Sequence, residues 1–482
     1  VARDFAAIDQ NRRGAVAAYI RHRHASAMPR GSLDDMGVIR GEIARRRGHK
    51  PIRRLMQMAG RTIQEIKPAF LMSPISVAQF LPPGALEFDL LVIDEASQVR
   101  PEEALGVIAR AKQIVVVGDV KQLPPTNFFA RLMSDEELEA EEDDDSAAPL
   151  QGAASSGDHE SILTLCESRG LPSRMLRWHY RSRHPSLIEV SNDEFYGADL
   201  VLPPVPRVER VEEGLILRRV AGVYDRGGKR TNAIEARAIV AAIAAHAART
   251  PSLSLGVATF STSQRDMVSQ LLEEARRDDT TLDAFLAGAP EEVFVKNLEN
   301  VQGDERDVIF ISVGYGPLAP GGRLATMSFG PVSQEGGERR LNVLFTRARL
   351  RCEVFVSFDP ADIDLNRSKS RGAQVLKRYL EFASSGVLNP STAAKSAPRD
   401  HESALEEDVA RVISDLGYRA DAQFGSAGFR IDLAVRHPEK SDRYMLAVEC
   451  DGAAYHTALW ARERDRLRQQ VLENLGWRFH RI

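Results

Sequence analysis

The chain has 482 residues, of which 43% are hydrophobic and 27% charged, so it is long enough for about two to four domains with cores of their own. No apolar run reaches the roughly 18 residues of a membrane helix, which favours a soluble, cytoplasmic protein without a membrane partner. The formal net charge of −4 excludes a uniformly basic nucleic-acid binder, and the three cysteines lie too far apart for a zinc or disulfide framework.

Residues 1–133 begin with basic, helical sequence and then change to a strand pattern. The start, VARDFAAIDQ, has neither an initiator methionine nor a signal peptide, which predicts that the chain begins inside a larger protein. EFDLLVIDEA at 87–96 and KQIVVVGD at 112–119 are apolar runs that end in acidic residues, as parallel strands buried on both faces do. With PEEALGVIAR as the crossover helix, the segment is predicted as an α/β lobe with a helical insertion.

An acidic segment separates this lobe from the next. SDEELEAEEDDD contains nine acidic residues and no basic one, and it runs into QGAASSGDHES, which is low in apolar residues. We predict a flexible, solvated loop over 134–158. The nine acids of this segment outnumber the formal net charge of −4, so the rest of the chain is net positive. A cationic nucleic-acid channel is therefore compatible with the composition.

Strand and helix patterns alternate again over 159–383, which predicts a second α/β lobe. The expected strands are LSLGVATF at 253–260, EVFVKNL at 292–298, DVIFISVGYG at 307–316 and RCEVFVSF at 351–358. Residues 384–400 are rich in serine, proline and alanine and are predicted as a linker. A third and smaller α/β domain is expected over 401–482.

Polar residues follow the two strands of the first lobe. Asp94 and Glu95 end one strand, where an NTPase needs one carboxylate to hold Mg²⁺ and a second to polarise the attacking water. Asp119 and Gln122 follow the next strand and are candidates for sensing the γ-phosphate. Taken alone, the Asp–Glu pair is equally compatible with a strand that ends in solvated acids.

Six sequence blocks now resemble those of superfamily 1 helicases, nearest to the nonsense-mediated-decay helicase group. DEAS and GDVKQLPPT are similar to motifs II and III, and LRWHYRSRHPSL, VATFSTSQ, ENVQGDERDVIF and RRLNVLFTRAR follow in the family's order. The resemblance implies two RecA-like, parallel-sheet lobes that use ATP and Mg²⁺ to move along nucleic acid, with DNA favoured and RNA possible. It favours 5′ to 3′ movement, although no residue fixes the direction.

The resemblance also assigns arginines to the reaction. Arg181, beside Tyr180 at the nucleotide, and Arg347 are the candidate fingers. Phosphoryl transfer builds negative charge on oxygens, and a guanidinium offers planar, permanently charged donors that lysine cannot match. For Arg347 the alternative is an ordinary arginine on a helix surface.

Two further blocks supply nucleotide and nucleic-acid contacts. In QGDE, Gly303 permits a tight turn, while Gln302 and Glu305 are expected to reach the nucleotide. Asn342 and Thr346 are spaced i and i+4, so they share a helix face and are predicted to contact nucleic acid.

The chain departs from the family at the phosphate loop. No GxxxxGK[ST] sequence occurs, so the lysine and glycine cradle for the β- and γ-phosphates are absent. In the family this loop precedes the segment that KPAFLMSPISVAQFLP at 67–83 resembles. We therefore predict that the chain alone hydrolyses ATP poorly.

The order of elements after residue 401 resembles the PD-(D/E)XK nuclease superfamily, in particular its very-short-patch-repair-like branch. An amphipathic helix is followed by FRIDLAV, by YMLAVECDG, by a helix over about 458–475 and by the strand WRFHRI. The resemblance implies a small restriction-endonuclease-like domain that cleaves DNA with Mg²⁺. Asp432 and Glu449 are the catalytic pair, and Asp451 joins them as a metal ligand.

Other residues of this domain keep two interpretations. Glu406 either joins the acidic site or forms a capping box with Ser403. His456 is either a general base or phosphate contact, or a structural histidine.

Asp451 stands where most members of the superfamily have a lysine. Arg462 or Arg466, on the helix, would then have to supply the positive charge as nucleic-acid contacts. The domain is thus predicted as an active nuclease, with a module that only binds as the alternative. The fusion suggests DNA repair or antiviral defence, an RNA or DNA remodeller remains the rival function, and protein partners are not predicted.

Overall fold

The computed structural model describes residues 2–31, 33–125, 160–206, 213–324, 326–386, 388, 403–425, 429–440, 443–450 and 459–482. Contacts divide the chain into two units, of which the first contains Val1–Val120 and Ala153–Pro172 and the second contains Ser173–Ile482. The predicted loop at 134–158 and most of the predicted linker at 384–400 lie outside the described residues. None of the helices within these ranges has both the length and the apolar character needed to cross a bilayer.

The first unit holds the front part of an α/β lobe. Strands β1 and β2 pair in parallel, with Ile93 opposite Val116, and α5 connects them as a crossover helix. Leucine and isoleucine side chains of these strands pack with α5 on one face. Val92 and Val115, on the other face, are 55% and 46% exposed, which contradicts the prediction that these two strands are buried on both faces. The elements are α1 (Ala2–Ala27), α2 (Asp34–Ile43), α3 (Ile52–Ile66), α4 (Pro74–Phe80), β1 (Leu91–Ile93), η1 (Ala96–Gln98), α5 (Pro101–Ile108), β2 (Ile114–Val116) and α7 (Ile162–Ser168).

Helix α7 belongs to this first unit, which differs from the predicted start of the second lobe at residue 159. Ile162 is buried in one cluster with Ile93, Ala96 and Ala104. Ser161 begins the helix with a capping box, in which its hydroxyl accepts a hydrogen bond from the Thr164 amide. The acidic segment therefore precedes the last helix of the first unit, and composition alone could not assign that helix.

The second unit contains a five-stranded sheet in the order β3-β7-β6-β4-β5, with every neighbouring pair parallel. This confirms the predicted RecA-like α/β class for the lobe. Strand β3 was not among the predicted strands, since GLILRR ends in two exposed arginines. The elements are η2 (Pro185–Leu187), α8 (Glu189–Tyr196), β3 (Gly214–Arg219), α9 (Ala233–Arg249), β4 (Leu255–Thr259), α10 (Thr262–Asp278), α11 (Thr280–Gly288), β5 (Phe294–Asn297), β6 (Arg306–Ser312), η3 (Gly330–Val332), α12 (Gly337–Phe345), β7 (Ala348–Val356), η4 (Pro360–Asp362) and α13 (Arg371–Ser385).

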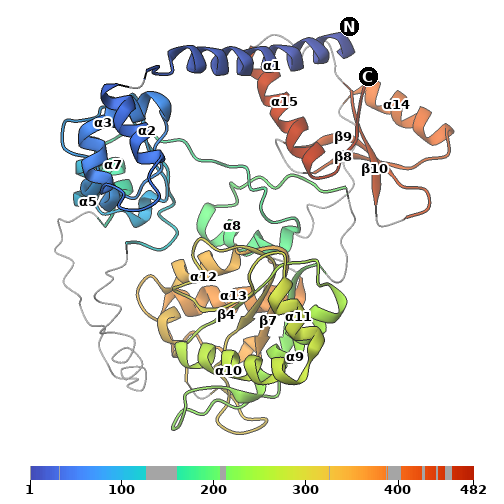
Figure 1. Ribbon diagram of the computed structural model, residues 1–482. Coiled ribbons are helices and arrows are strands. Elements are labelled where there is room, and N and C mark those ends of the chain that lie inside the picture. The colour runs from blue at the N-terminus through green and yellow to red at the C-terminus, as the bar shows by residue number, and fades with distance from the viewer. Residues whose placement is uncertain are drawn as a thin grey trace. The chain divides into compact units, whose positions relative to one another are not determined.

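Both faces of this sheet are buried, as its unbroken apolar strands require. Helices α9, α10 and α11 cover one face and α12 and α13 the other (Figure 1). In β6, Val308 and Phe310 point into the first layer while Ile309 and Ile311 point into the second. Alternate side chains thus fill two cores, and each large buried side chain contributes about 1.5 to 3 kcal/mol.

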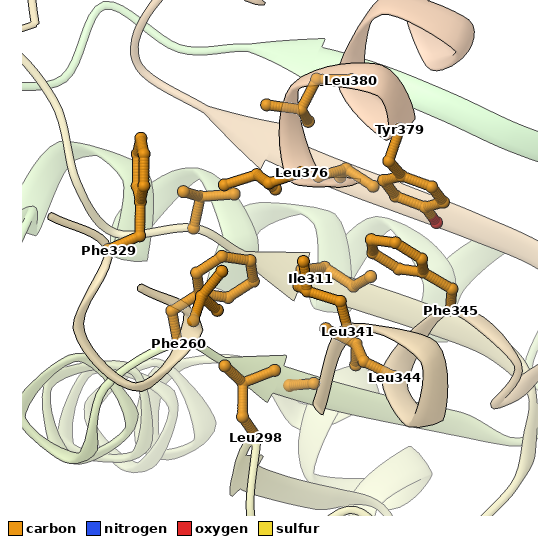
Figure 2. Close-up of a cluster of buried hydrophobic side chains, with 14 of the residues drawn as sticks. Phe260, Leu298, Ile311, Phe329, Leu341, Leu344, Phe345, Leu376, Tyr379 and Leu380 are labelled. Atoms are coloured by element: carbon orange, nitrogen blue, oxygen red, sulfur yellow. The ribbon is translucent and has the colours of Figure 1, made fainter. Parts of the chain in front are cut away.

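The layer beneath α12 and α13 is dominated by aromatic and leucine side chains, several of which are drawn in Figure 2. Phe345, the last residue of α12, stacks on Tyr379 of α13 with ring centroids 3.4 Å apart. Leu341 and Leu344 enter the same layer from α12. This packing fixes the end of α12, where the motif with Arg347 begins.

The C-terminal domain has a four-stranded mixed sheet in the order β11-β10-β9-β8, in which β10 is parallel to β11 and antiparallel to β9. The predicted order of helix, two strands, helix and strand is present, with β8 as an additional strand. The sequence ADAQF gave no strand prediction because it has few large apolar residues. The elements are α14 (Ala404–Asp415), β8 (Ala420–Phe424), β9 (Ile431–Arg436), β10 (Tyr444–Glu449), α15 (Leu459–Asn474) and β11 (Phe479–Arg481).

Candidate functional site

The two acids of the first unit stand where β1 ends. Asp94 and Glu95 are both exposed, and Asp94 Oδ1 accepts a hydrogen bond from the Glu95 amide at 3.0 Å. Glu95 adopts left-handed backbone angles, φ 52° and ψ 39°, which a residue with a side chain rarely adopts outside special sites. The turn therefore presents both carboxylates at the strand end in a conformation that costs free energy.

The neighbouring strand β2 ends beside this turn. The amide of Ala96 donates to Val117 O at 2.9 Å, so the two strand ends share one edge. A Cβ atom on Gly118 would lie 3.0 Å from the Ser97 amide nitrogen, and only a glycine allows this approach without movement. Asp119 follows directly and is half-buried, and its predicted role stays a prediction.

Gln122 lies in a short segment that packs with the second unit. Asn342 Nδ2 donates to Lys121 O at 2.9 Å, and Leu123 joins the apolar core of the second lobe. Gln122 itself is half-buried. Its predicted γ-phosphate role remains a prediction.

In the second lobe, the predicted finger Arg181 is held by an acid of the predicted nucleotide contacts. Its Nε lies 2.5 Å from Glu305 Oε2, and Glu305 is also bound by Arg349 at 3.0 Å. Burial would raise the pKa of Glu305, but the two guanidinium groups outweigh it and lower the pKa. Tyr180, beside Arg181, is 71% exposed, so its ring is open to a ligand.

Arg347 lies close to the same place but is buried. It is 4% exposed, and its guanidinium donates to Val343 O at 2.7 Å and to Thr346 Oγ1 at 3.0 Å. Burial first, and then the charges of Arg181 and Arg347, lower the pKa of His179 to about 4. Both predicted fingers thus lie near enough to His179 for their charges to act on its imidazole.

The remaining helicase-like residues surround that position. Gly303 has φ +87°, as predicted for a tight turn, and Gln302 Nε2 is buried without a hydrogen-bond partner. Asn342 is fully buried and its amide donates to Tyr196 OH at 2.9 Å, while Thr346 is 7% exposed. The predicted nucleic-acid contacts of Asn342 and Thr346 gain no support from this burial.

Three carboxylates converge in the C-terminal domain. Asp432 lies in β9, Glu449 ends β10, and Glu406 lies in α14. Burial raises the pKa of Asp432 to about 6, opposed by the Cys450 amide, which donates to Asp432 Oδ2 at 2.8 Å. The charges of Glu449 and Glu406 raise this pKa further, so the three groups share one electrostatic site.

The structure shows the helix cap of Glu406, while its role in the acidic site stays a prediction. Its amide donates to Ser403 Oγ at 3.2 Å as a helix cap, and its side chain is only 6% exposed and reaches the acidic site. Gln423 Nε2 donates to Glu406 Oε2 at 2.9 Å. Gln423 has φ 51°, a second left-handed residue at a candidate site, and nothing in the sequence indicated it.

Arg468 of α15 is the cation that sequence reasoning missed. Its Nη2 and Nη1 donate to Glu449 Oε1 and Oε2 at 2.9 and 3.1 Å, and it also donates to Arg430 O. Arg462 and Arg466 were predicted to supply positive charge in this domain, and that role stays a prediction, while Arg468 is the arginine that binds Glu449. Arg468 lies two residues after Arg466, and the sequence would have identified it if the phase of the helix had been known.

Part of the predicted metal site lies outside the described residues, namely Asp451, His456 and the side chain of Arg462. Within the described ranges, no three acidic, histidine or cysteine side chains are placed to hold a metal ion. The oxygen donors of Asp432 and Glu449 fit Mg²⁺ by type, since this ion prefers carboxylates and water. Asp432, Glu449 and Asp451 are therefore the residues that would hold it.

Comparisons with known families agree with this division. Residues 77–129 and 159–357 each match an AAA domain family, and residues 405–482 match the family REase_MTES_1575, a restriction-endonuclease-like domain. The matches cover the acidic edge of the first unit, the arginines of the second lobe and the carboxylates of the C-terminal domain.

Several curated proteins are similar in sequence. The uncharacterized ATP-dependent helicase MG140 of Mycoplasma genitalium is 31% identical over 363 residues, which cover 72% of this chain and 30% of that protein. Its homolog in Mycoplasma pneumoniae is 32% identical, over 68% of this chain and 28% of that protein. The 5′-3′ DNA helicase ZGRF1 of Mus musculus is 27% identical, over 55% and 12%. The chain thus spans less than a third of the length of these relatives.

Proposed function

We propose that this chain is part of an ATP-dependent DNA helicase or translocase that carries a tethered, Mg²⁺-dependent endonuclease domain. The observation that supports the motor best is the ion pair between Arg181 and Glu305, two residues of the helicase-like motifs in the second lobe. Permanent positive charges gathered by a helicase-like lobe suit the negative charge that develops on a transferred phosphoryl group. The similarity to a 5′-3′ DNA helicase supports DNA as the substrate and 5′ to 3′ movement.

In this proposal the acids and the arginines of the motifs have separate roles. Asp94 would hold Mg²⁺ at the phosphates and Glu95 would orient the attacking water. Arg181 would leave Glu305 and bind the phosphoryl oxygens, while Gln302, with its unpaired buried amide, would contact the nucleotide together with Tyr180, Gly303 and Glu305. Asp119 and Gln122 would respond to loss of the γ-phosphate.

The motor is tested in the gene product that contains this chain. We expect single-stranded DNA to stimulate its ATPase more than RNA does, and Asp94→Asn to abolish that turnover. The chain by itself, which has no phosphate-loop sequence, is expected to hydrolyse ATP poorly. Robust turnover by residues 1–482 that Asp94→Asn removes would contradict this assignment of the phosphate loop.

In the nuclease domain, Asp432 and Glu449 would hold the metal with Asp451. When bound, Mg²⁺ activates water and neutralises the leaving oxygen of a phosphodiester. Glu406 and Gln423 orient the acidic site, and Arg468 places its positive charge beside Glu449 in the position that a lysine usually fills. His456 and the helix residues Arg462 and Arg466 are proposed to contact the nucleic-acid backbone.

One observation favours a second candidate function, a domain that binds nucleic acid without cleaving it. Arg468 donates to both oxygens of Glu449, so this carboxylate has a cation of the protein as its partner. Asp432→Ala and Glu449→Ala separate the two functions. A nuclease loses Mg²⁺-dependent cleavage in both variants and retains DNA binding, whereas a binding module shows no cleavage before mutation.

A role in DNA repair or in defence against foreign DNA follows from the fusion of motor and nuclease-like parts. Such a role predicts that cells lacking the gene become more sensitive to DNA damage or to phage. Infection and damage assays on a deletion strain distinguish the two.

A further inference from the structure

Residues 177–206, which we call the clasp, join two parts of the second unit that are far apart in sequence. Trp178 and Val201 form a parallel β-bridge inside the clasp. The amide of His179 donates to Val201 O at 3.0 Å, and the amide of Val201 donates to Arg177 O at 2.7 Å. The two ends of the clasp are therefore held side by side.

The middle of the clasp is fixed to the RecA-like lobe. The amide of Arg183 donates to Arg349 O, in β7, at 2.8 Å, and Leu187 and Val190 are buried in the lobe's core. Asn192, in α8, extends this attachment, because its side chain bonds both the amide and the carbonyl of Leu200. The backbone that leads to Val201 is thus tied to the lobe.

The two ends of the clasp enter the core of the nuclease-like domain. The ring of Trp178 meets that of Phe429 edge to face with centroids 4.8 Å apart, and Val201 packs in the same cluster. Trp477 Nε1 donates to Pro204 O at 2.8 Å. The amide of Tyr444, at the start of β10, donates to Pro206 O at 3.2 Å.

We propose that the clasp is a docking surface that holds the nuclease-like domain on the second lobe independently of the covalent linker. An aromatic side chain of the clasp in the core of the nuclease-like domain, and buried polar groups satisfied by the clasp, are features of a specific interface rather than of a loose tether. Because the clasp also carries Arg181, the nuclease-like domain and the arginine loop move as one body.

Cutting the linker tests the proposal in the full chain. A specific protease site is inserted between residues 389 and 400, the chain is cleaved, and the products are separated by size-exclusion chromatography in high salt. The clasp predicts that the C-terminal fragment co-elutes with the remainder, because the contacts are apolar and hydrogen-bonded and salt does not screen them. Separation of the fragments of the unmutated chain would overturn the proposal.

Matched variants identify the surface. Trp178→Ala removes the ring that packs on Phe429 and is expected to release most of the cleaved fragment. Leu176→Ala, two residues earlier and 76% exposed, is expected to release none. Trp477→Phe keeps the ring but loses the hydrogen bond to Pro204, and a partial release is expected. Complete retention in both tryptophan variants contradicts the proposal. The result for the unmutated chain stands even where Trp178→Ala fails to fold.

Discussion

The charged groups of the second lobe and of the nuclease-like domain are balanced in opposite ways. In the lobe, Arg181 and Arg347 together depress the pKa of His179, and Glu305 is the acid that pairs with Arg181. In the C-terminal domain, the carboxylates of Glu406, Asp432 and Glu449 act on one another with Arg468 as their cation. The guanidinium groups of the lobe are paired with acids, since Arg349 also binds Glu291 and Glu305, whereas three carboxylates of the C-terminal domain act on one another.

The comparison indicates the kind of ligand that each site suits. An excess of guanidinium groups is relieved by an anion such as a phosphate, and an excess of carboxylates is relieved by a cation. The two sites also differ in the ion pairs that their own residues must break when a ligand binds. Arg181 must leave a half-exposed acid, whereas Glu449 is tied to a buried guanidinium.

Removing the cation of the acidic site should have the largest effect. In Arg468→Ala, Glu449 loses its partner in a position where the side chains are only 13% and 8% exposed, and breaking such a buried pair costs about 3 to 5 kcal/mol. We expect the urea transition of the C-terminal domain, followed through Trp477 fluorescence, to shift accordingly.

The double variant Arg468→Met with Glu449→Gln is the control for this change. It removes both charges and should recover most of the lost stability without recovering any cleavage. An unchanged transition in Arg468→Ala would show that the pair is not formed in solution.

Substitution of the two arginines of the lobe should change its stability by different amounts but should reduce the ATPase activity alike. Arg347→Ala deletes a buried side chain with several hydrogen bonds and should cost about 2 to 3 kcal/mol, whereas Arg181→Ala, in a half-exposed pair, should cost less than about 1 kcal/mol. Both should reduce the DNA-stimulated ATPase of the gene product by roughly 1,000-fold or more. Equal destabilisation with ATPase retained in Arg181→Ala would remove Arg181 from the proposed finger role.

Glu235 should make the lobe less stable as the pH rises. This carboxyl is fully buried, and burial raises its pKa to about 7 despite hydrogen bonds from Ser312, Gly314 and Ser357. A raised pKa stabilises the fold below the ordinary value of 4.5, and this contribution is lost as the pH rises through about 7.

We therefore expect up to about 3 kcal/mol of the lobe's stability to disappear between pH 5 and pH 8, counted at about 1.4 kcal/mol for each unit of pKa change. The side chain of residue 235 cannot titrate in Glu235→Gln, so the thermal midpoint of this variant should change less with pH across this window than that of the unmutated chain. Parallel pH profiles would mean that Glu235 does not carry the dependence.

A further effect on stability is expected at the acidic edge of the first unit. Gly118→Ala places a Cβ atom 3.0 Å from the Ser97 amide and should cost about 1 to 3 kcal/mol by displacing the turn that holds Asp94 and Glu95. Gly106→Ala, in the exposed helix α5, has room and should stabilise by about 0.5 to 1 kcal/mol. If the close approach exists, the thermal midpoint falls in Gly118→Ala and rises in Gly106→Ala, relative to the unmutated chain.

The sequence was sufficient to predict the strands wherever apolar runs are long and buried on both faces. The strands of the second lobe were predicted within a few residues, because β4, β6 and β7 read as unbroken apolar segments. Strands β3 and β8 were missed, since each has polar or small residues on an accessible face. Helix α7 packs in the first unit, and the sequence alone does not show which sheet such a helix covers.

The candidate sites divide in the same way. The acids of Asp432 and Glu449 and the turn at Gly303 follow from strand ends and motif spacing. The pairing of Arg181 with Glu305, the burial of Arg347 and the choice of Arg468 over Arg466 depend on helix phase and long-range packing. The left-handed backbone of Glu95 and of Gln423 has no sequence signature at all, because neither residue favours that region.

The clasp imposes an order on biosynthesis. Pro204 and Trp477 are 273 residues apart, so a ribosome that adds roughly 5 to 20 residues per second completes the partner about 15 to 55 seconds after the clasp has emerged. During that interval Trp178 and Val201 have no core to enter, and they present an apolar surface that chaperones recognise. A truncated product that ends before Phe429 keeps this surface permanently, which makes incomplete chains prone to aggregation and degradation.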